Sequence, residues 1–121
     1  MTENLLMNYA EQLAIDIEIM CQSLAKIKDC SNTVFQIRKS SSSVFANITE
    51  AQYPQSLPDM LSKLKIARKE CFETESWLKL LFSTGYINEK IFKDKRNLCG
   101  RIRRMLTASC ITIEKKIKQW A

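Results

Sequence analysis

The chain has 121 residues, of which 45% are hydrophobic and 26% charged, and this length and balance fit one soluble globular domain covering residues 1–121. Nineteen basic residues against thirteen acidic ones give a formal net charge of +6, which makes a polyanion such as RNA or DNA the first partner to consider. The lack of histidine excludes histidine-containing zinc sites, and two glycines and two prolines are too few for the turns of a sheet protein.

The first predicted helix lies within the opening thirty residues. Its apolar residues recur at alternating spacings of four and three, which places them along one side of a helix. They are Leu6, Ala10, Leu13, Ile17, Met20, Leu24 and Ile27. Acidic residues come early and Lys26 and Lys28 come late, which suits the helix dipole. The chain from Cys30 to Asn32 is expected to break this helix.

The second predicted helix repeats the same spacing. Its seam consists of Val34, Ile37, Ser41, Val44, Ile48 and Ala51. Thr33 to Gln36 has the form of a capping box, with Ser31 and Asn32 as competing caps. The segment from Gln52 to Ser56 contains a proline and closes the helix.

The third predicted helix opens at Ser56, with Pro58 and Asp59 in its first turn. Its seam consists of Met60, Leu64, Ala67, Cys71, Thr74, Leu78 and Leu81. Gly85 follows Thr84 and suits the position just beyond a helix end.

The fourth predicted helix begins after Asn88, which can cap it. Its apolar positions include Ile91, Phe92, Leu98, Ile102, Leu106, Ile113, Ile117 and Trp120. Gly100 costs about 1 kcal/mol relative to alanine, so a kink or break is expected there as one alternative. Four amphipathic helices with short joints predict an all-α fold, an antiparallel up-down-up-down four-helix bundle.

Several aromatic residues lie beside these seams. They are Phe35, Phe45, Trp77, Phe82 and Trp120. Two interpretations stay open: they enlarge the core or its rim, or some of them form a subunit interface, because monomers rarely expose large apolar patches.

A polar stripe runs beside the apolar seam of the second helix, and two carboxylates lie close to the seam of the third. We expect these residues to form a structural polar network, because a buried lone charge is costly. Arg38, Ser40 and Asn47 are the expected partners of Glu70 and Glu73. The full set is Gln36, Arg38, Ser40, Ser43, Asn47, Glu50, Glu70 and Glu73.

The same region carries a family resemblance. It rests on QIRKSSSSVFANITEA (residues 36–51), KLKIARKECFETESWLKLL (residues 63–81) and the SxGYI of residues 83–87. These stretches resemble the four-helix-bundle family of 23S rRNA intervening-sequence proteins, which includes the accessory variability determinant of diversity-generating retroelements. The chain departs from the family pattern after Glu50, where Ala51 stands in place of a common glycine and the following residues lack an arginine.

The resemblance implies an antiparallel bundle that often assembles into a ring-like homopentamer, with no established enzymatic activity. One branch looks like a basic nucleic-acid-binding scaffold that partners a reverse transcriptase. The other branch is encoded inside ribosomal RNA insertions, and the sequence does not assign the chain to either.

Basic residues are concentrated in the last helix. The segment from Glu89 to Lys118 holds ten basic residues against three acidic ones, whereas the first thirty-one residues hold two against five. The residues expected to bind nucleic acid are Lys93, Lys95, Arg96, Arg101, Arg103, Arg104, Lys115, Lys116 and Lys118. They spread over more than one helix face, which suits a phosphate backbone better than base edges.

The leading hypothesis is therefore a non-catalytic scaffold that binds RNA or DNA largely without regard to sequence. Two alternatives remain: a solvated helix face with no ligand, and an adaptor whose basic face docks an acidic protein partner. We expect no catalytic residue, because the chain lacks histidine and a glycine-rich phosphate loop. We also expect no cofactor.

Five cysteines are scattered along the chain without a CxxC pair, namely Cys21, Cys30, Cys71, Cys99 and Cys110. Their odd number and wide spacing indicate small apolar core residues in a reducing compartment, and we expect no metal site. No run approaches the roughly 18 uncharged residues of a membrane span. The expected location is the cytoplasm, with no membrane partner.

Overall fold

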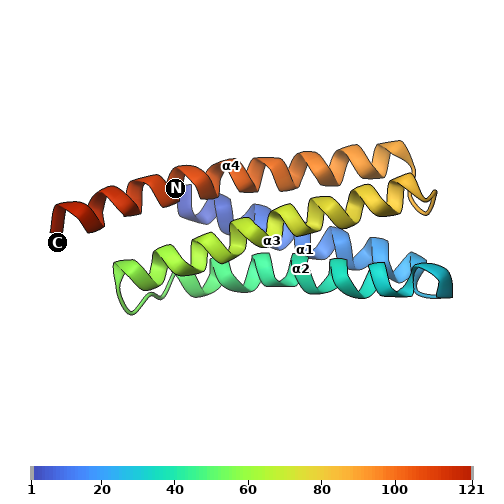
Figure 1. Cartoon of the computed structure of the whole chain (residues 1–121), viewed down its shortest axis with the longest axis horizontal. Coiled ribbons are helices and arrows are strands. Elements are labelled where there is room, and N and C mark those ends of the chain that lie inside the picture. The colour runs from blue at the N-terminus through green and yellow to red at the C-terminus, as the bar shows by residue number, and fades with distance from the viewer. Residues whose placement is uncertain (1, 121) are drawn as a thin grey trace.

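The structure is a computed structural model that describes the backbone of residues 2–120 and the side chains of residues 5–120. It contains α1 (Thr2–Leu24), the short 3-10 helix η1 (Lys28–Cys30), α2 (Ser31–Ala51), α3 (Leu57–Ser83) and α4 (Glu89–Trp120). Figure 1 shows the four long helices running alternately in opposite directions. The predicted all-α, antiparallel up-down-up-down four-helix bundle is confirmed.

The predicted seams form the core. The side chains of Leu13, Ile37, Leu78 and Ile102 have no exposed surface, and the buried residues of all four helices join in one cluster. Two predicted positions are exposed. Ile27 is 39% exposed because α1 ends at Leu24, and Trp120 is 78% exposed at the end of α4. Alternating three- and four-residue spacing therefore identified the packed face along most of each helix.

Three of the predicted helix boundaries are confirmed, two by capping bonds and one by the backbone conformation of a glycine. The Ser56 hydroxyl accepts a hydrogen bond from the Asp59 amide at 3.1 Å, and the Asn88 side chain accepts one from the Ile91 amide at 2.9 Å. Gly85 has a φ of 84°, in the left-handed region where glycine is favoured. These residues fix where α3 starts, where α3 ends and where α4 starts.

The predicted capping box of the second helix is wrong. Helix α2 begins at Ser31, two residues earlier than Thr33, and Cys30 occupies the cap position without a side-chain cap bond. The reason is local: η1 leads directly into α2, so its last residues supply the turn that a capping side chain otherwise stabilises.

Gly100 does not break α4, which is continuous from Glu89 to Trp120. The glycine is buried, and a methyl group placed there would lie 3.2 Å from Nη1 of Arg104 and 3.8 Å from Nη2 of Arg103. Its missing side chain therefore leaves room for two guanidinium groups to lie along the helix backbone.

The aromatic residues beside the seams divide between the two interpretations. Phe45, Trp77 and Phe82 are partly buried and pack against the core. Phe35 is 61% exposed and Trp120 is 78% exposed, so neither enlarges the core of one bundle.

Helix α4 extends beyond the start of α1, as the end of the red ribbon past the N-terminus shows in Figure 1. At this end of the bundle a groove of about 550 Å³ opens among α1, the start of α3 and the second half of α4. Most of its lining is apolar and includes Leu6, Met60, Leu64, Met105 and Ile113. At this corner of the bundle the helices therefore leave apolar surface uncovered.

Candidate nucleic-acid interface

Three of the nine predicted binding residues are neutralised by carboxylates. Lys93 pairs with Glu89 at 2.7 Å one turn earlier in α4, and Lys95 pairs with Asp16 of α1 at 3.5 Å. Arg103 pairs with Glu75 of α3 at 2.9 Å. These three charges are thus partly engaged within the protein, and their role in binding nucleic acid stays a prediction. Lys95 and Arg103 face neighbouring helices, where they hold the bundle together.

Arg103 is fixed more firmly than a usual surface arginine. Its Nε and Nη2 atoms donate to the two carboxylate oxygens of Glu75 at 2.9 and 3.2 Å, and its guanidinium lies 4.7 Å from the ring centre of Phe72. This fork-to-fork geometry fixes the guanidinium plane. Arg103 is therefore held in one orientation by Glu75 and Phe72.

Two further arginines rest on aromatic rings. The Arg96 guanidinium lies 4.8 Å from the ring centre of Phe92, and Lys79 of α3 approaches the same ring at 5.8 Å. Arg101 lies 5.2 Å from the ring centre of Tyr9 and donates a hydrogen bond to its hydroxyl at 3.1 Å. Cation–π contacts hold these groups in place without cancelling their charge.

Arg104 is the least constrained of the four arginines. It is exposed, and within residues 5–120 it makes neither a hydrogen bond nor an ion pair. Nη1 of this side chain lies above Gly100, where any larger residue would displace it.

These arginines surround a hollow of about 370 Å³ on α4. Its lining residues are Glu75, Arg96, Asn97, Gly100, Arg101, Arg103 and Arg104. Four arginines and one glutamate thus line the hollow, and the Glu75 carboxylate is already engaged by Arg103. Such a hollow suits an oxyanion with several acceptor atoms, of which phosphate is the most common in biology.

Helix α3 contributes basic residues that the sequence analysis missed. Burial raises the pKa of the Cys110 thiol of α4, while the charges of Arg68 and Lys65 oppose that shift because both lie near it. The missed signal was the order Lys65, Arg68, Phe72, Glu75 and Lys79, which recurs at spacings of three and four beside the α3 seam.

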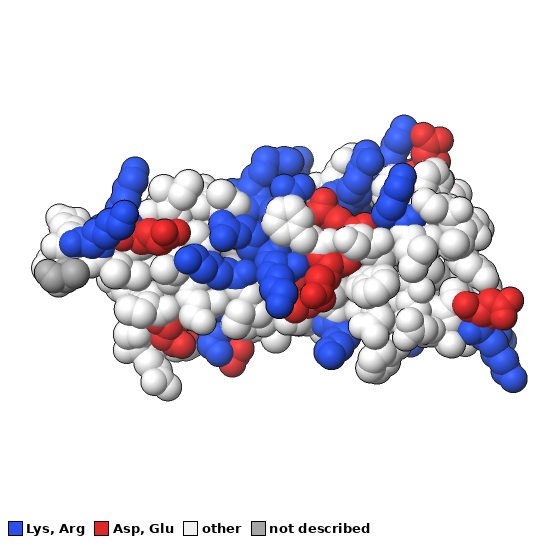
Figure 2. Space-filling view, in the orientation of Figure 1, with Lys and Arg blue, Asp and Glu red and all other residues white. Residues whose placement is uncertain are grey.

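We call the combined surface the α3–α4 basic face and define it as Lys65, Arg68, Lys79, Arg96, Arg103 and Arg104. Figure 2 shows Lys and Arg side chains gathering at mid-length over α3 and α4, with some acidic side chains beside them. The predicted basic surface is therefore shared by two helices and is not confined to the last one.

The three C-terminal lysines lie apart from this surface. Lys115, Lys116 and Lys118 are exposed near the end of α4. At 1.5 Å per residue, Lys115 lies roughly 16 Å along the helix from Arg104. A ligand must therefore be extended to contact both groups.

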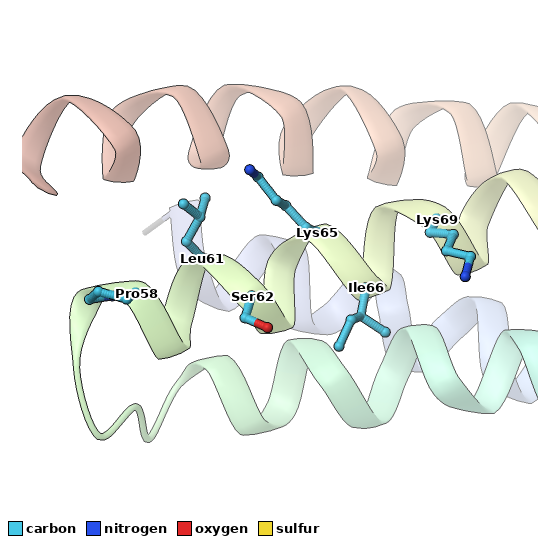
Figure 3. A pocket seen from close by; sticks show the side chains of 6 residues that line it. All are labelled: Pro58, Leu61, Ser62, Lys65, Ile66 and Lys69. Carbon is cyan, nitrogen blue, oxygen red and sulfur yellow. The ribbon is translucent and has the colours of Figure 1, made fainter. Parts of the chain in front are cut away.

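A second pocket lies on the outer side of α3 (Figure 3), and all six of its lining residues come from the first half of that helix. A depression lined by one helix offers no converging groups for chemistry. Figure 3 does show Lys65 extending toward α4, which agrees with its place in the basic face.

The polar stripe of α2 does not form the predicted network with Glu70 and Glu73. Arg38 points to α1, where its Nε and Nη2 atoms donate to Glu18 at 3.0 and 2.9 Å. Asn47 donates within α2, to the carbonyl and hydroxyl oxygens of Ser43. The expected partners of the two glutamates are thus engaged elsewhere.

The other residues of the predicted network also make contacts that differ from the predicted ones. Glu50 approaches Lys63 of α3 at 3.9 Å, and no hydrogen bond joins Gln36 to another side chain in the described part of the chain. Partial burial raises the pKa of Glu70, with a further rise from the charge and hydrogen bond of Glu73. Ser40 also bridges α2 and α3, through a 2.8 Å contact between its hydroxyl and that of Thr74.

All five cysteines are buried free thiols. Burial raises the pKa of the Cys21 thiol to about 11 and that of Cys71 to about 12, so both are neutral near pH 7. Within the described residues no cluster of acidic and cysteine side chains is arranged to hold a metal ion. None of the helices between residues 2 and 120 is both long and apolar enough to cross a membrane.

Comparison with known proteins identifies relatives of the chain. The sequence model of the family described as 23S rRNA-intervening sequence protein matches residues 2–108. A crystal structure of a protein of unknown function, from the S23 ribosomal protein family of Bacteroides thetaiotaomicron, is 33% identical, with a TM-score of 0.87 over 91% of this chain and 98% of that chain. No curated protein matches the chain. The arginine-lined hollow lies within the matched region, and the three C-terminal lysines lie beyond it.

Proposed function

The chain belongs to the 23S rRNA-intervening sequence protein family, and we propose that it is a non-catalytic scaffold that binds the phosphate backbone of RNA or DNA in the cytoplasm. The observation that carries this proposal is the hollow over Gly100, which is lined by four arginines and one glutamate. Crowded like charges repel one another, and a bound phosphate relieves that repulsion.

The arrangement favours backbone contacts over base reading. Its cations come from two helices that pack side by side in the bundle, so the α3–α4 basic face is a broad surface and not a single projecting helix. Insertion into a major groove needs one exposed helix with side chains aimed at base edges. Contacts with phosphates alone give binding that is largely independent of sequence.

In its wider role, the scaffold is proposed to accompany a reverse transcriptase or to act in connection with ribosomal RNA, in line with the family resemblance. Either role needs a basic surface that holds nucleic acid for another component. The same face could dock an acidic protein, and the nuclease test below separates that adaptor role from nucleic-acid binding.

We further propose that the chain forms a homo-oligomer, with a homopentamer as the expected form. Ile15, Ile19 and Phe35 are exposed on α1 and α2, and the apolar groove among α1, α3 and α4 leaves further surface to cover. The acidic first segment and the basic α4 of neighbouring copies also attract each other. Light scattering tests this proposal, because a particle of 14.0 kDa would be a monomer and would contradict it.

Titration with a structured RNA at two salt concentrations tests the proposed function. About four phosphate contacts predict affinity roughly 100-fold weaker at about 200 mM than at about 50 mM salt. Affinity indifferent to salt would overturn the proposal. A pull-down from nuclease-treated lysate serves as the companion experiment, because a partner retained after digestion would favour the adaptor.

A further inference from the structure

Phe72 is an exposed aromatic residue in the middle of a charged surface. Its side chain is 53% exposed on α3, in the same stripe as Arg68, Glu75 and Lys79. Single exposed apolar residues are common and need no explanation by themselves. This one differs because a fixed arginine contacts its ring and a hollow rich in guanidinium groups lies next to it.

The contact with Arg103 orients the ring. The guanidinium lies 4.7 Å from the ring centre of Phe72 and is fixed by its two hydrogen bonds to Glu75. The ring is therefore supported from one direction, while half of its surface stays open to solvent. A planar group that stacks on the open surface meets a ring that is already positioned, so it loses less entropy on binding.

Arg103 connects this ring to the arginine-lined hollow. The same guanidinium that contacts Phe72 also lines the hollow together with Arg96 and Arg104. A phosphate in the hollow and a base on the ring would thus both contact one side chain. That juxtaposition matches a nucleotide, in which an anionic phosphate and an aromatic base lie close together.

We propose that the α3–α4 basic face prefers single-stranded nucleic acid, with an unpaired base stacked on Phe72 and a neighbouring phosphate in the hollow over Gly100. This inference rests on the proposed function and narrows its ligand. Bases of a duplex are stacked inside the helix and cannot reach the ring, so a duplex gains only the phosphate contacts. A base stacked on an aromatic side chain adds roughly tenfold or more in affinity.

The test compares a short single-stranded oligouridine with a fully paired hairpin by fluorescence anisotropy. Phe72→Leu keeps an apolar side chain but removes the aromatic face, and it should weaken binding of the single strand about tenfold while changing hairpin binding less than about twofold. Phe72→Trp keeps an aromatic face and should therefore bind the single strand about as tightly as the wild type does. Tyr53→Leu is the matched control, because Tyr53 is an exposed aromatic residue in the loop between α2 and α3, outside the basic face.

The outcomes separate the two proposals. The stacking inference would be overturned if the wild type bound the oligouridine and the hairpin equally well, or if Phe72→Leu lost the same affinity for both. The proposed function would still stand in either case if binding depended on salt. An absence of salt-dependent binding to either ligand would overturn both. Because Phe72 is half exposed, the substitution leaves the core intact, and a thermal melt of each variant checks this.

Discussion

Reversing the charge of Arg96, Arg101 and Arg104 together, to glutamate, is expected to lower the affinity for RNA by at least about 100-fold at about 50 mM salt. These three arginines line the hollow and have no carboxylate partner within the described residues, so their positive charge is available to a ligand. The substitution removes their phosphate contacts and puts repulsive charges in their place. The slope of affinity against salt should also fall by about three, one for each lost contact.

A second triple variant controls for the change in net charge. Lys26→Glu, Lys28→Glu and Lys39→Glu alter the total charge by the same amount, but these exposed lysines lie at the η1 end of the bundle and on α2, outside the α3–α4 basic face. This variant should lose much less affinity, because long-range attraction is screened beyond about 10 Å at moderate salt. Equal loss in both variants would mean that net charge drives binding and that the hollow does not.

The fold was predictable from sequence because each helix carries a regular seam. Spacings of three and four determine which side chains a helix can bury, whatever its partner. Leu13, Ile37, Leu78 and Ile102 follow that rule and are fully buried. The cap residues Ser56 and Asn88 were also predictable, because their side chains bond to the backbone only three residues away.

The candidate site was only partly predictable, because its contacts depend on how the helices are rotated against one another. The pairs of Lys95 with Asp16 and Arg103 with Glu75 join residues far apart in sequence. Nothing in the order of residues states which flank of α4 faces α1 and which faces α3. The pair of Lys93 with Glu89 is different, since a spacing of four on one helix is a local signal.

The polar stripe shows the same limit. Its spacing correctly placed Ser40 beside α3, but the separate expectation that Arg38 contacts Glu70 and Glu73 was wrong. Residues two positions apart on a helix point about 200° apart, so Ser40 faces α3 while Arg38 faces Glu18 of α1. A stripe of polar residues beside a seam therefore says little about which helix each one contacts.

Replacing Ser40 with leucine is expected to lower the free energy of unfolding by roughly 2–4 kcal/mol. Ser40 is buried between α2 and α3, and its hydroxyl lies 2.8 Å from that of Thr74, which in turn donates to the Glu70 carbonyl at 2.9 Å. The small side chain lets the two helices approach closely. Leucine overfills the site and also removes the bond, so both helices must shift. Urea denaturation followed by circular dichroism measures the change.

Ser40→Ala separates the loss of the hydrogen bond from the overpacking. Alanine fits the available space, and the Thr74 hydroxyl keeps its bond to the Glu70 carbonyl, so no buried donor is left without a partner. The expected cost is about 1 kcal/mol or less. If Ser40→Leu were no less stable than Ser40→Ala, the space between α2 and α3 would have to be larger than the structure indicates. The close approach of the two helices would then need a cause other than the small side chain at this position.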